Sequence, residues 1–157
     1  CQVMSELKEL IPGSEHWPKL ERNNSNRFEA RMVQVKINKS NSNFFDGMEG
    51  SQLLVPVNHG EGKMIFPEHV CAKKIISDNL VPMQFCTNKG IEAKEFPENP
   101  NGSTNGITAV TNDDGRFLIM MPHPERSFLN NQLSWTNEKG KHSPWFKLFL
   151  NARNFYS

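Results

Sequence analysis

A histidine and a glutamate two residues apart, in the stretch MMPHPERSF (residues 120–128), are the side chains best suited to chemistry. Proline precedes and follows His123; proline lacks an N–H, fixes φ near about −65° and disfavours helix for the residue before it. We therefore predict an extended His123 whose side chain projects on the same side as Glu125. A carboxylate so placed orients the imidazole and leaves one ring nitrogen free as a general base. A proline-rich loop with a solvated histidine and glutamate fits the same pattern.

A general base of this kind needs a nucleophile, and the cysteines Cys1, Cys71 and Cys86 are candidates, as is a serine that the pattern does not single out. Cys71 and Cys86 lie in apolar stretches and are expected in the core. Cys1 precedes a predicted amphipathic helix, a position that favours a reactive thiolate. No CxxC or Cys/His ligand spacing is present, so we expect no metal site. The odd number of cysteines suits a reducing, cytosolic setting.

The elements that must position these residues mix helical and strand patterns, so we predict an α/β or α+β class. Helices are expected over residues 3–11, 68–80 and 143–155. Strands are expected over residues 33–37, 53–57, 82–87, 107–111 and 116–121. The last two should form a hairpin around the turn NDDG, and Pro56 indicates an edge position or an irregularity in its strand. The tryptophans Trp17, Trp135 and Trp145 are predicted to pack in the interior.

Length and charge restrict the possible classes of protein. A chain of 157 residues fits one domain, residues 1–157, and folding at this size buries roughly 70% of the extended chain's surface. Lys and Arg total 18 against 17 for Asp and Glu, so no basic stripe indicates nucleic acid. No run of about 18 apolar residues could span a membrane. We expect a cytoplasmic protein that binds neither nucleic acid nor membrane.

Five segments, quoted in chain order, together resemble one enzyme domain. They are CQVMSELKELIPGSEHWP, RFEAR, NHGEG, NPNGSTNGITAVT and MMPHPERSF. The chain resembles the C-terminal glutaminase domain of the large, single-chain phosphoribosylformylglycinamidine synthases, also called formylglycinamide ribonucleotide amidotransferases. The resemblance covers essentially all 157 residues in order. It implies a class I glutamine amidotransferase with a three-layer, flavodoxin-like α/β fold, of which this chain is the C-terminal part.

The same resemblance implies a function and its residues. Glutamine would be hydrolysed, and the ammonia would serve a synthetase portion, a C–N bond-forming ligase of purine biosynthesis that amidates formylglycinamide ribonucleotide. ATP and magnesium would bind that portion and not this chain. His123 would be the general base and Glu125 its orienting carboxylate. Gln2, His59 and Gly60 would bind glutamine. For His59 the alternative is a turn histidine whose flanking glycines supply positive φ.

The cysteine requires separate treatment. The family places its nucleophile in an elbow of the form G-V-C-N-G-C-Q, and Cys1-Gln2 match its last two residues. By this match the nucleophile would lie three positions before residue 1. Losing a nucleophile removes several orders of magnitude of rate, so we expect the chain alone to be inactive. We also expect an incomplete sheet that exposes a strand edge and apolar surface.

Two other functions remain open. Cys1 could be the nucleophile of an N-terminal-nucleophile hydrolase, with its own α-amine as base. The chain could also be a non-catalytic docking module that contacts a synthetase portion. The segment NPNGSTNG is predicted to be a structural turn and not a phosphate cradle, because it lacks the lysine and spacing of a P-loop.

Overall fold

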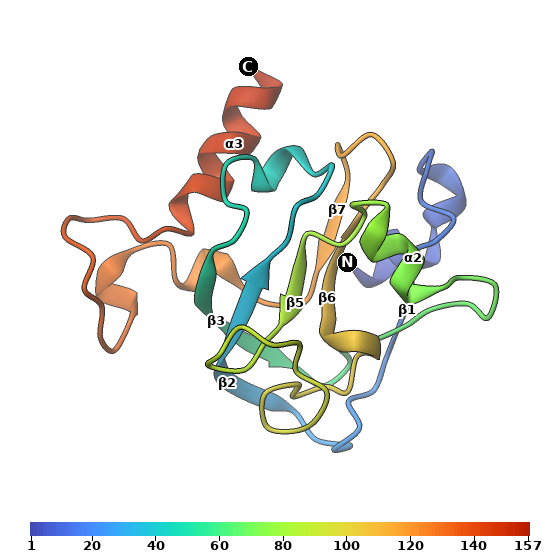
Figure 1. The fold of residues 1–157 in the computed structure, drawn as a ribbon, viewed down its shortest axis with the longest axis horizontal. Helices are drawn as coiled ribbons and strands as arrows, with labels where there is room; N and C mark the ends of the chain where they lie inside the picture. The colour runs from blue at the N-terminus through green and yellow to red at the C-terminus, as the bar shows by residue number, and fades with distance from the viewer.

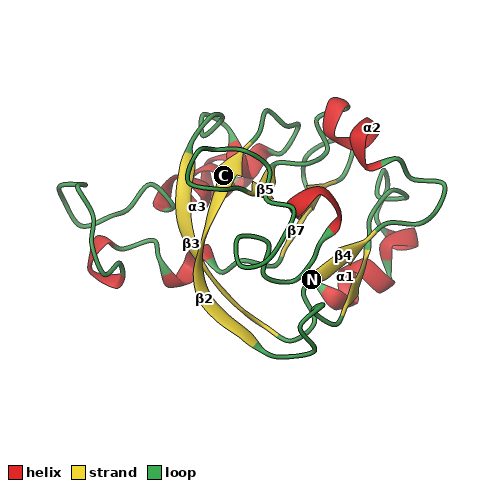
Figure 2. Ribbon diagram, turned by 60° about the horizontal axis from the view of Figure 1, so that its bottom comes forward, coloured by secondary structure: helices red, strands yellow, loops and turns green.

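The computed structural model describes residues 1–157 and shows a mixed α/β fold around one curled sheet. Five strands lie in the order β3-β2-β5-β6-β7, and each neighbouring pair is antiparallel. Their bounds are β2 (Glu29–Ile37), β3 (Gln52–His59), β5 (Met83–Phe85), β6 (Ile107–Thr111) and β7 (Leu118–Met120). The β2–β3 pair is a long curved ribbon in Figure 2. Pro56 lies in β3, an outer strand of the sheet, which confirms the predicted edge position.

A second, two-stranded sheet pairs β1 (Lys19–Glu21) with β4 (Lys63–Ile65), and neither strand was predicted. The helices are α1 (Gln2–Glu6), α2 (Ala72–Ser77) and α3 (Phe146–Tyr156). The 3-10 turns are η1 (Lys8–Leu10), η2 (Asn43–Phe45), η3 (Thr104–Gly106), η4 (Pro124–Arg126) and η5 (Asn130–Gln132). Figure 1 shows α3 beside β3 and α2 at the opposite side of the molecule. None of the helices combines the length and apolar character needed to cross a bilayer.

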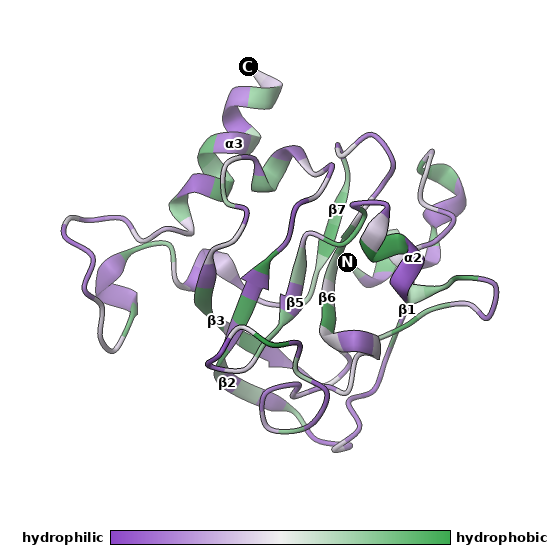
Figure 3. Cartoon of the chain, viewed as in Figure 1, coloured by the Kyte–Doolittle hydropathy of each residue, from purple (hydrophilic) through white to green (hydrophobic).

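The five-stranded sheet has a hydrophobic core on each side, which gives the predicted three layers. On one side Trp145 and Leu148, at the start of α3, pack with the side chains of β2, β3 and β5. The indole N–H of Trp145 donates to the backbone carbonyl of Leu54 at 2.8 Å, which ties α3 to the edge strand. On the other side Trp17 and Met64 pack with α2 and with side chains of β6 and β7. Figure 3 shows the hydrophobic colouring of β6, whose five residues are all buried.

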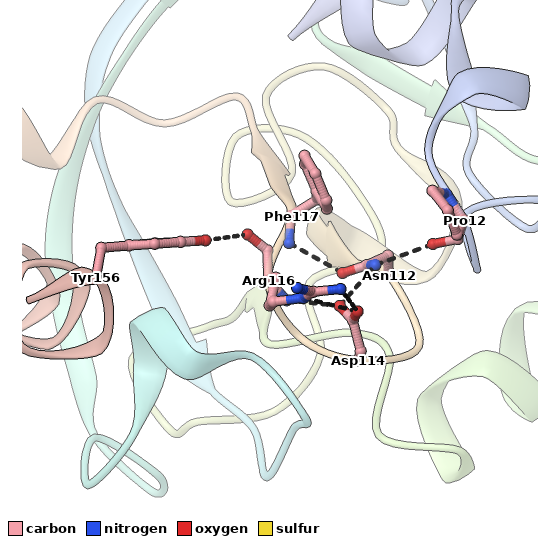
Figure 4. Close-up of polar contacts among 6 residues, drawn as sticks. All are labelled: Pro12, Asn112, Asp114, Arg116, Phe117 and Tyr156. Carbon is pink, nitrogen blue, oxygen red and sulfur yellow. Dashed lines mark hydrogen bonds and ion pairs between the residues drawn. The ribbon is translucent and has the colours of Figure 1, made fainter.

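The predicted hairpin around NDDG is confirmed as β6 and β7, and its turn binds both the loop after η1 and the last helix. The Asn112 amide donates to the Pro12 carbonyl at 3.0 Å, and the Tyr156 hydroxyl donates to the Arg116 carbonyl at 2.8 Å (Figure 4). Within the turn, the Arg116 guanidinium lies 2.7 Å from the Asp114 carboxylate. Hydrogen bonds from Arg116 lower the pKa of Asp114 to about 2. The turn of this hairpin therefore connects the loop after η1 with the last helix.

The helix predicted over residues 3–11 is replaced by a shorter helix and a separate 3-10 turn. These are α1 and η1, and Met4 packs against the second core. Val3, Leu7 and Leu10 share a face at helical spacing but are exposed, with relative accessibilities of 69%, 51% and 76%. The apolar residues therefore recur at helical spacing as predicted, but only some of their side chains pack against the rest of the fold. The helix predicted over 68–80 is likewise reduced to α2.

Three further predictions needed correction. Trp135 is exposed because it lies in the segment after η5, which projects away from the sheet at the left of Figure 1. Cys71 is exposed at the start of α2, whereas Cys86 is buried as predicted. The final helix, predicted over residues 143–155, runs from Phe146 to Tyr156. The Ser143 hydroxyl accepts a hydrogen bond from the Trp145 N–H at 3.2 Å, a bond of the kind that an N-cap residue makes, in the turn just before the helix.

Candidate active site

The strand β7 delivers His123 and Glu125 to a tight turn in which the two side chains meet. His123 Nδ1 lies 2.7 Å from Glu125 Oε1, so the predicted contact is present. Its expected geometry was wrong, because His123 (φ −113°, ψ 75°) caps the 3-10 turn η4 and does not continue the strand. Proline at the first position of η4 suits such a turn, since its missing N–H would have no partner there. The His123 N–H donates to the Pro56 carbonyl at 2.8 Å, which fixes the turn against β3.

The contact with Glu125 determines which imidazole nitrogen can act as a base. A carboxylate only accepts hydrogen bonds, so the Nδ1 of His123 carries the hydrogen and Nε2 keeps its lone pair. The side chain of His123 is 29% accessible and that of Glu125 is 54% accessible. Arg126 Nε lies 3.8 Å from the same carboxylate oxygen, on the outer side. The pair is therefore an imidazole held by a carboxylate at the surface of the domain, which is the geometry that a general base requires.

A cavity of about 550 Å³ lies beside His123. Its lining comes from the N-terminus, the turn after β3 and the end of β7: Cys1, Gln2, His59, Gly60, Glu61, Met120, Met121 and His123. The size is that of a small-molecule site. The structure thus gathers Gln2, His59, Gly60 and His123, four of the five predicted site residues, around one space. Glu125 does not line the cavity and is connected to it by its contact with His123.

Cys1 also lines this cavity, but its thiol does not contact the imidazole. The Sγ atom donates to the Met120 carbonyl at 3.0 Å, which is its one hydrogen bond. An activated cysteine nucleophile is recognised by a hydrogen bond to its base, although such bonds are often longer before substrate binds. Cys1 therefore lines the cavity, but its thiol has no hydrogen bond to a side chain that could act as its base.

His59 is buried at the end of β3, and neither ring nitrogen has a hydrogen-bond partner. Burial, followed by the charge of nearby His123, lowers its pKa, so the ring is neutral. The ring packs directly on Gly62, where an added Cβ would lie 2.2 Å from a ring carbon. Neither Gly60 nor Gly62 has positive φ. Glycine is therefore needed at position 62 because the His59 ring lies against its Cα. The prediction that the two glycines supply positive φ was wrong.

Two buried asparagines that the sequence did not single out hold the turn from His59 to Gly62. The Asn23 amide donates to the His59 carbonyl at 2.8 Å, and its oxygen accepts from the Gly62 N–H at 3.2 Å. The Asn23 N–H donates to the Gly60 carbonyl at 3.0 Å. Asn101 donates to the Gly62 carbonyl at 2.7 Å. Because Asn101 belongs to NPNGSTNG, that segment is a structural turn, as predicted, and it supports the cavity wall.

A buried carboxylate lies behind the same turn. Glu29 pairs with His59 across β2 and β3 and is 5% accessible. The Ser25 hydroxyl donates to it at 2.7 Å and the Arg31 guanidinium at 2.6 Å. No three His, Cys, Asp or Glu side chains come together as a metal site.

With this geometry defined, the comparisons with known proteins identify the family. The sequence profile of the CobB/CobQ-like glutamine amidotransferase domain matches residues 1–156. The chain belongs to this family. A glutamine amidotransferase domain that places an oriented histidine beside a small-molecule cavity has its candidate active site there.

Solved structures of similar fold include the following one. It is described as the structure of PurLQS from Thermotoga maritima, with a TM-score of 0.68 and 21% sequence identity. The match covers 99% of this chain and 58% of that chain, so this chain spans a little under three fifths of its length. The likeness confirms the class I glutamine amidotransferase fold.

Proposed function

We propose that this chain is the C-terminal portion of the glutaminase domain of a phosphoribosylformylglycinamidine synthase. The observation that carries the proposal is the His123–Glu125 pair, 2.7 Å apart, at a cavity of about 550 Å³ in a glutamine amidotransferase domain. The similarity to PurLQS of Thermotoga maritima and the five segments that resemble these synthases support it.

In the proposed reaction, His123 Nε2 takes the proton of a cysteine thiol. The thiolate then attacks the side-chain amide carbon of glutamine, and a thioester forms as the C–N bond breaks. The protonated His123 returns its proton to the leaving nitrogen, which departs as ammonia. Water hydrolyses the thioester to glutamate and frees the thiol. Glu125 keeps Nδ1 protonated throughout and stabilises the imidazolium, while Gln2, His59 and Gly60 form the walls that hold glutamine.

The proposal assigns the nucleophile to a cysteine of the elbow and not to Cys1. It rests on the match of Cys1-Gln2 to the end of the elbow motif and on the bond of the Cys1 thiol to the Met120 carbonyl. It follows that residues 1–157 alone should not hydrolyse glutamine. The ammonia would be used by a synthetase portion that amidates formylglycinamide ribonucleotide with ATP and magnesium. No step proposed for this chain passes through ATP or magnesium.

The test is intact-mass analysis of the full-length enzyme after treatment with an electrophilic glutamine analogue, followed by peptide mapping. We expect one label per molecule, retained in Cys1→Ser and located outside residues 1–157. Glutaminase rates of His123→Ala and Glu125→Gln should fall by about 10²–10⁴-fold, the usual contribution of a general base. The exposed His69→Ala and Glu68→Gln serve as matched controls and should keep the wild-type rate.

A second candidate function is favoured by one observation, the presence of Cys1 in the same cavity as His123. An N-terminal-nucleophile hydrolase would use the Cys1 thiol with its own α-amine. Loss of the label in Cys1→Ser would contradict the proposed elbow match, and together with a free α-amine at Cys1 it would establish this alternative. An enzyme that neither takes the label nor hydrolyses glutamine would contradict both.

A further inference from the structure

Two adjoining cavities lie where the loop before β2 meets the loop before η3. Their volumes are about 460 Å³ and 450 Å³, and Ser25 and Phe96 line both of them. Neither has a lining residue in common with the cavity beside His123. We propose that together they bind a nucleotide, with its phosphate in the larger cavity and its base in the other. This site goes beyond the proposed glutaminase function, and its nucleotide is not the ATP that the synthetase portion would use.

The larger cavity, called the arginine cavity below, has the guanidinium groups of Arg27 and Arg31 in its wall. Arg27 is exposed and takes part in no ion pair. Arg31 Nη2 lies 2.6 Å from Glu29 Oε2 and is the one nitrogen of its group with a partner, since Nε is buried without one. A guanidinium carries five N–H groups and can bind two oxygens of a phosphate at once. The arginine cavity therefore offers donors for an oxyanion that the chain itself leaves unused.

The charges around the two cavities favour an anion. Glu29 is 5% accessible, and both of its oxygens are occupied, by the Ser25 hydroxyl at 2.7 Å and by Arg31. This carboxylate therefore holds Arg31 in place and has no free oxygen for a ligand. Counted over both linings, three cations stand against two carboxylates: Arg27, Arg31 and Lys94 against Glu29 and Glu95.

The ring of Phe96 lies between the two cavities and is 59% accessible. The Arg31 guanidinium lies over this ring, with Cζ 4.5 Å from the ring centroid. Phe28, which is 63% accessible, adds a second aromatic side chain to the arginine cavity. Proteins hold unpaired bases by stacking them on aromatic rings and on guanidinium planes. A phosphate bound at Arg31 would thus lie next to the ring on which its base can stack.

The second cavity contains an amide that can read the edge of a base. Asn24 lines it, is exposed, and makes no hydrogen bond through its side chain. The position of this side chain is fixed, because its nitrogen packs on Gly102, 2.0 Å from where a Cβ would be. The backbone N–H of Asn24 also donates to the Asn101 carbonyl at 3.1 Å. An asparagine amide offers one donor and one acceptor side by side, the pattern that pairs with an adenine edge.

The ligand must be long enough to use both cavities. Each volume is within the range of small-molecule sites, and the two adjoin at Ser25 and Phe96. An inorganic phosphate would occupy the arginine cavity alone, and a nucleoside would leave its guanidinium groups unpaired. A nucleoside monophosphate supplies both the anion and the planar ring.

The experiment is photolabelling of the full-length enzyme with 8-azido-AMP, followed by tryptic peptide mapping. Trypsin places the residues of the two cavities in peptides 23–27, 28–31 and 95–116, so label at nucleotide sites elsewhere in the enzyme falls in other peptides. We expect saturable label in at least one of these three peptides, prevented by AMP. Adenosine, which lacks the phosphate, and ribose 5-phosphate, which lacks the base, should each need at least about 10-fold higher concentrations to prevent it.

Substitutions test the two halves of the site separately. Arg27→Gln removes an unpaired cation and should raise the AMP concentration for half protection about 10-fold. Arg31→Lys keeps a cation beside Glu29 but loses the fork that binds phosphate, and Phe96→Leu loses the stacking surface; each should weaken protection by about 5-fold or more. Arg153→Gln and Phe155→Leu, both exposed, are the matched controls and should keep wild-type protection. A wild-type Tm shows that each variant is folded.

Three results would overturn the inference. The first is absence of label from the three peptides, whether the cavities bind nothing or another part of the enzyme covers them. The second is protection by ribose 5-phosphate or adenosine at the same concentration as AMP, which would mean that only one half of the ligand is recognised. The third is wild-type protection in folded Arg27→Gln and Phe96→Leu. Labelling needs no glutamine hydrolysis, so these results leave the proposed function untouched, and loss of glutaminase activity leaves this inference untouched.

Discussion

The buried side chain of Asn23 offers the sharpest test of how the cavity wall is held. It donates to the carbonyls of Arg27 (2.9 Å) and His59 (2.8 Å) and accepts from the Gly62 N–H (3.2 Å). Asn23→Ala removes all three bonds and leaves buried backbone groups without partners, each at a cost of about 1–3 kcal/mol before relaxation. We expect a loss of about 3 kcal/mol in the free energy of unfolding, because the backbone can recover some of these bonds by shifting.

The assay is urea unfolding of the full-length enzyme, followed by tryptophan fluorescence, with glutaminase kinetics on the same samples. Asn23→Asp keeps the shape and the acceptor for Gly62 but places a carboxylate against two carbonyl oxygens, so its loss should equal or exceed that of Asn23→Ala. Asn88→Ala, at an exposed side chain without hydrogen bonds, should change stability by less than about 0.5 kcal/mol. The reasoning would be refuted by an Asn23→Ala enzyme that loses less than about 1 kcal/mol and keeps its KM for glutamine.

Three further predictions concern stability. Burial lowers the pKa of His16 and His59 below 6.5, so their unfolded forms take up protons that the folded forms resist. The stability that these two histidines contribute should therefore be present above pH 6.5 and decline as the pH falls below it. Urea midpoints at pH 7.5 and 5.5 measure this decline. A decline of the same size in a His16→Gln, His59→Gln double variant would show that other groups cause it. Gly62→Ala should cost about 1–3 kcal/mol, because its Cβ would lie 2.2 Å from the His59 ring; wild-type Tm in this variant would show that the ring moves freely. Tyr156→Phe should cost about 1 kcal/mol through its bond to the Arg116 carbonyl, and an unchanged urea midpoint would show that this bond adds nothing.

The part of the site that could be predicted from the residues alone is local in the chain. His123 and Glu125 are only two positions apart, and the flanking prolines exclude an α-helix through His123, so their proximity could be predicted from the chain alone. The contact was found even though the conformation that produces it is a 3-10 turn. The roles of Gln2, His59 and Gly60 came only through the family resemblance and stay proposals. Their shared cavity depends on contacts that no local pattern encodes.

The supports of the site could not be predicted for the same reason. Asn23 and Asn101 lie 36 to 39 positions from their partners in the turn, and both stand in polar stretches typical of exposed loops. The strands β1 and β4 contain three residues each, too few to show alternation. The hairpin β6–β7, in contrast, has both the apolar runs and the turn chemistry, and it was found with nearly its observed bounds. For the first helix, periodicity alone could not say which apolar side chains the rest of the fold would cover.

The bond between the His123 N–H and the Pro56 carbonyl has a consequence for aggregation. Outer strands of sheets are sites at which chains add to one another, and β3 is such a strand. Pro56 has no N–H to offer an incoming strand, and its carbonyl is already occupied by His123 at 2.8 Å. The turn that carries the proposed base thus also covers the middle of this edge. Variants that loosen residues 122–126 should therefore lose solubility along with activity, and light scattering should accompany any rate measured on them.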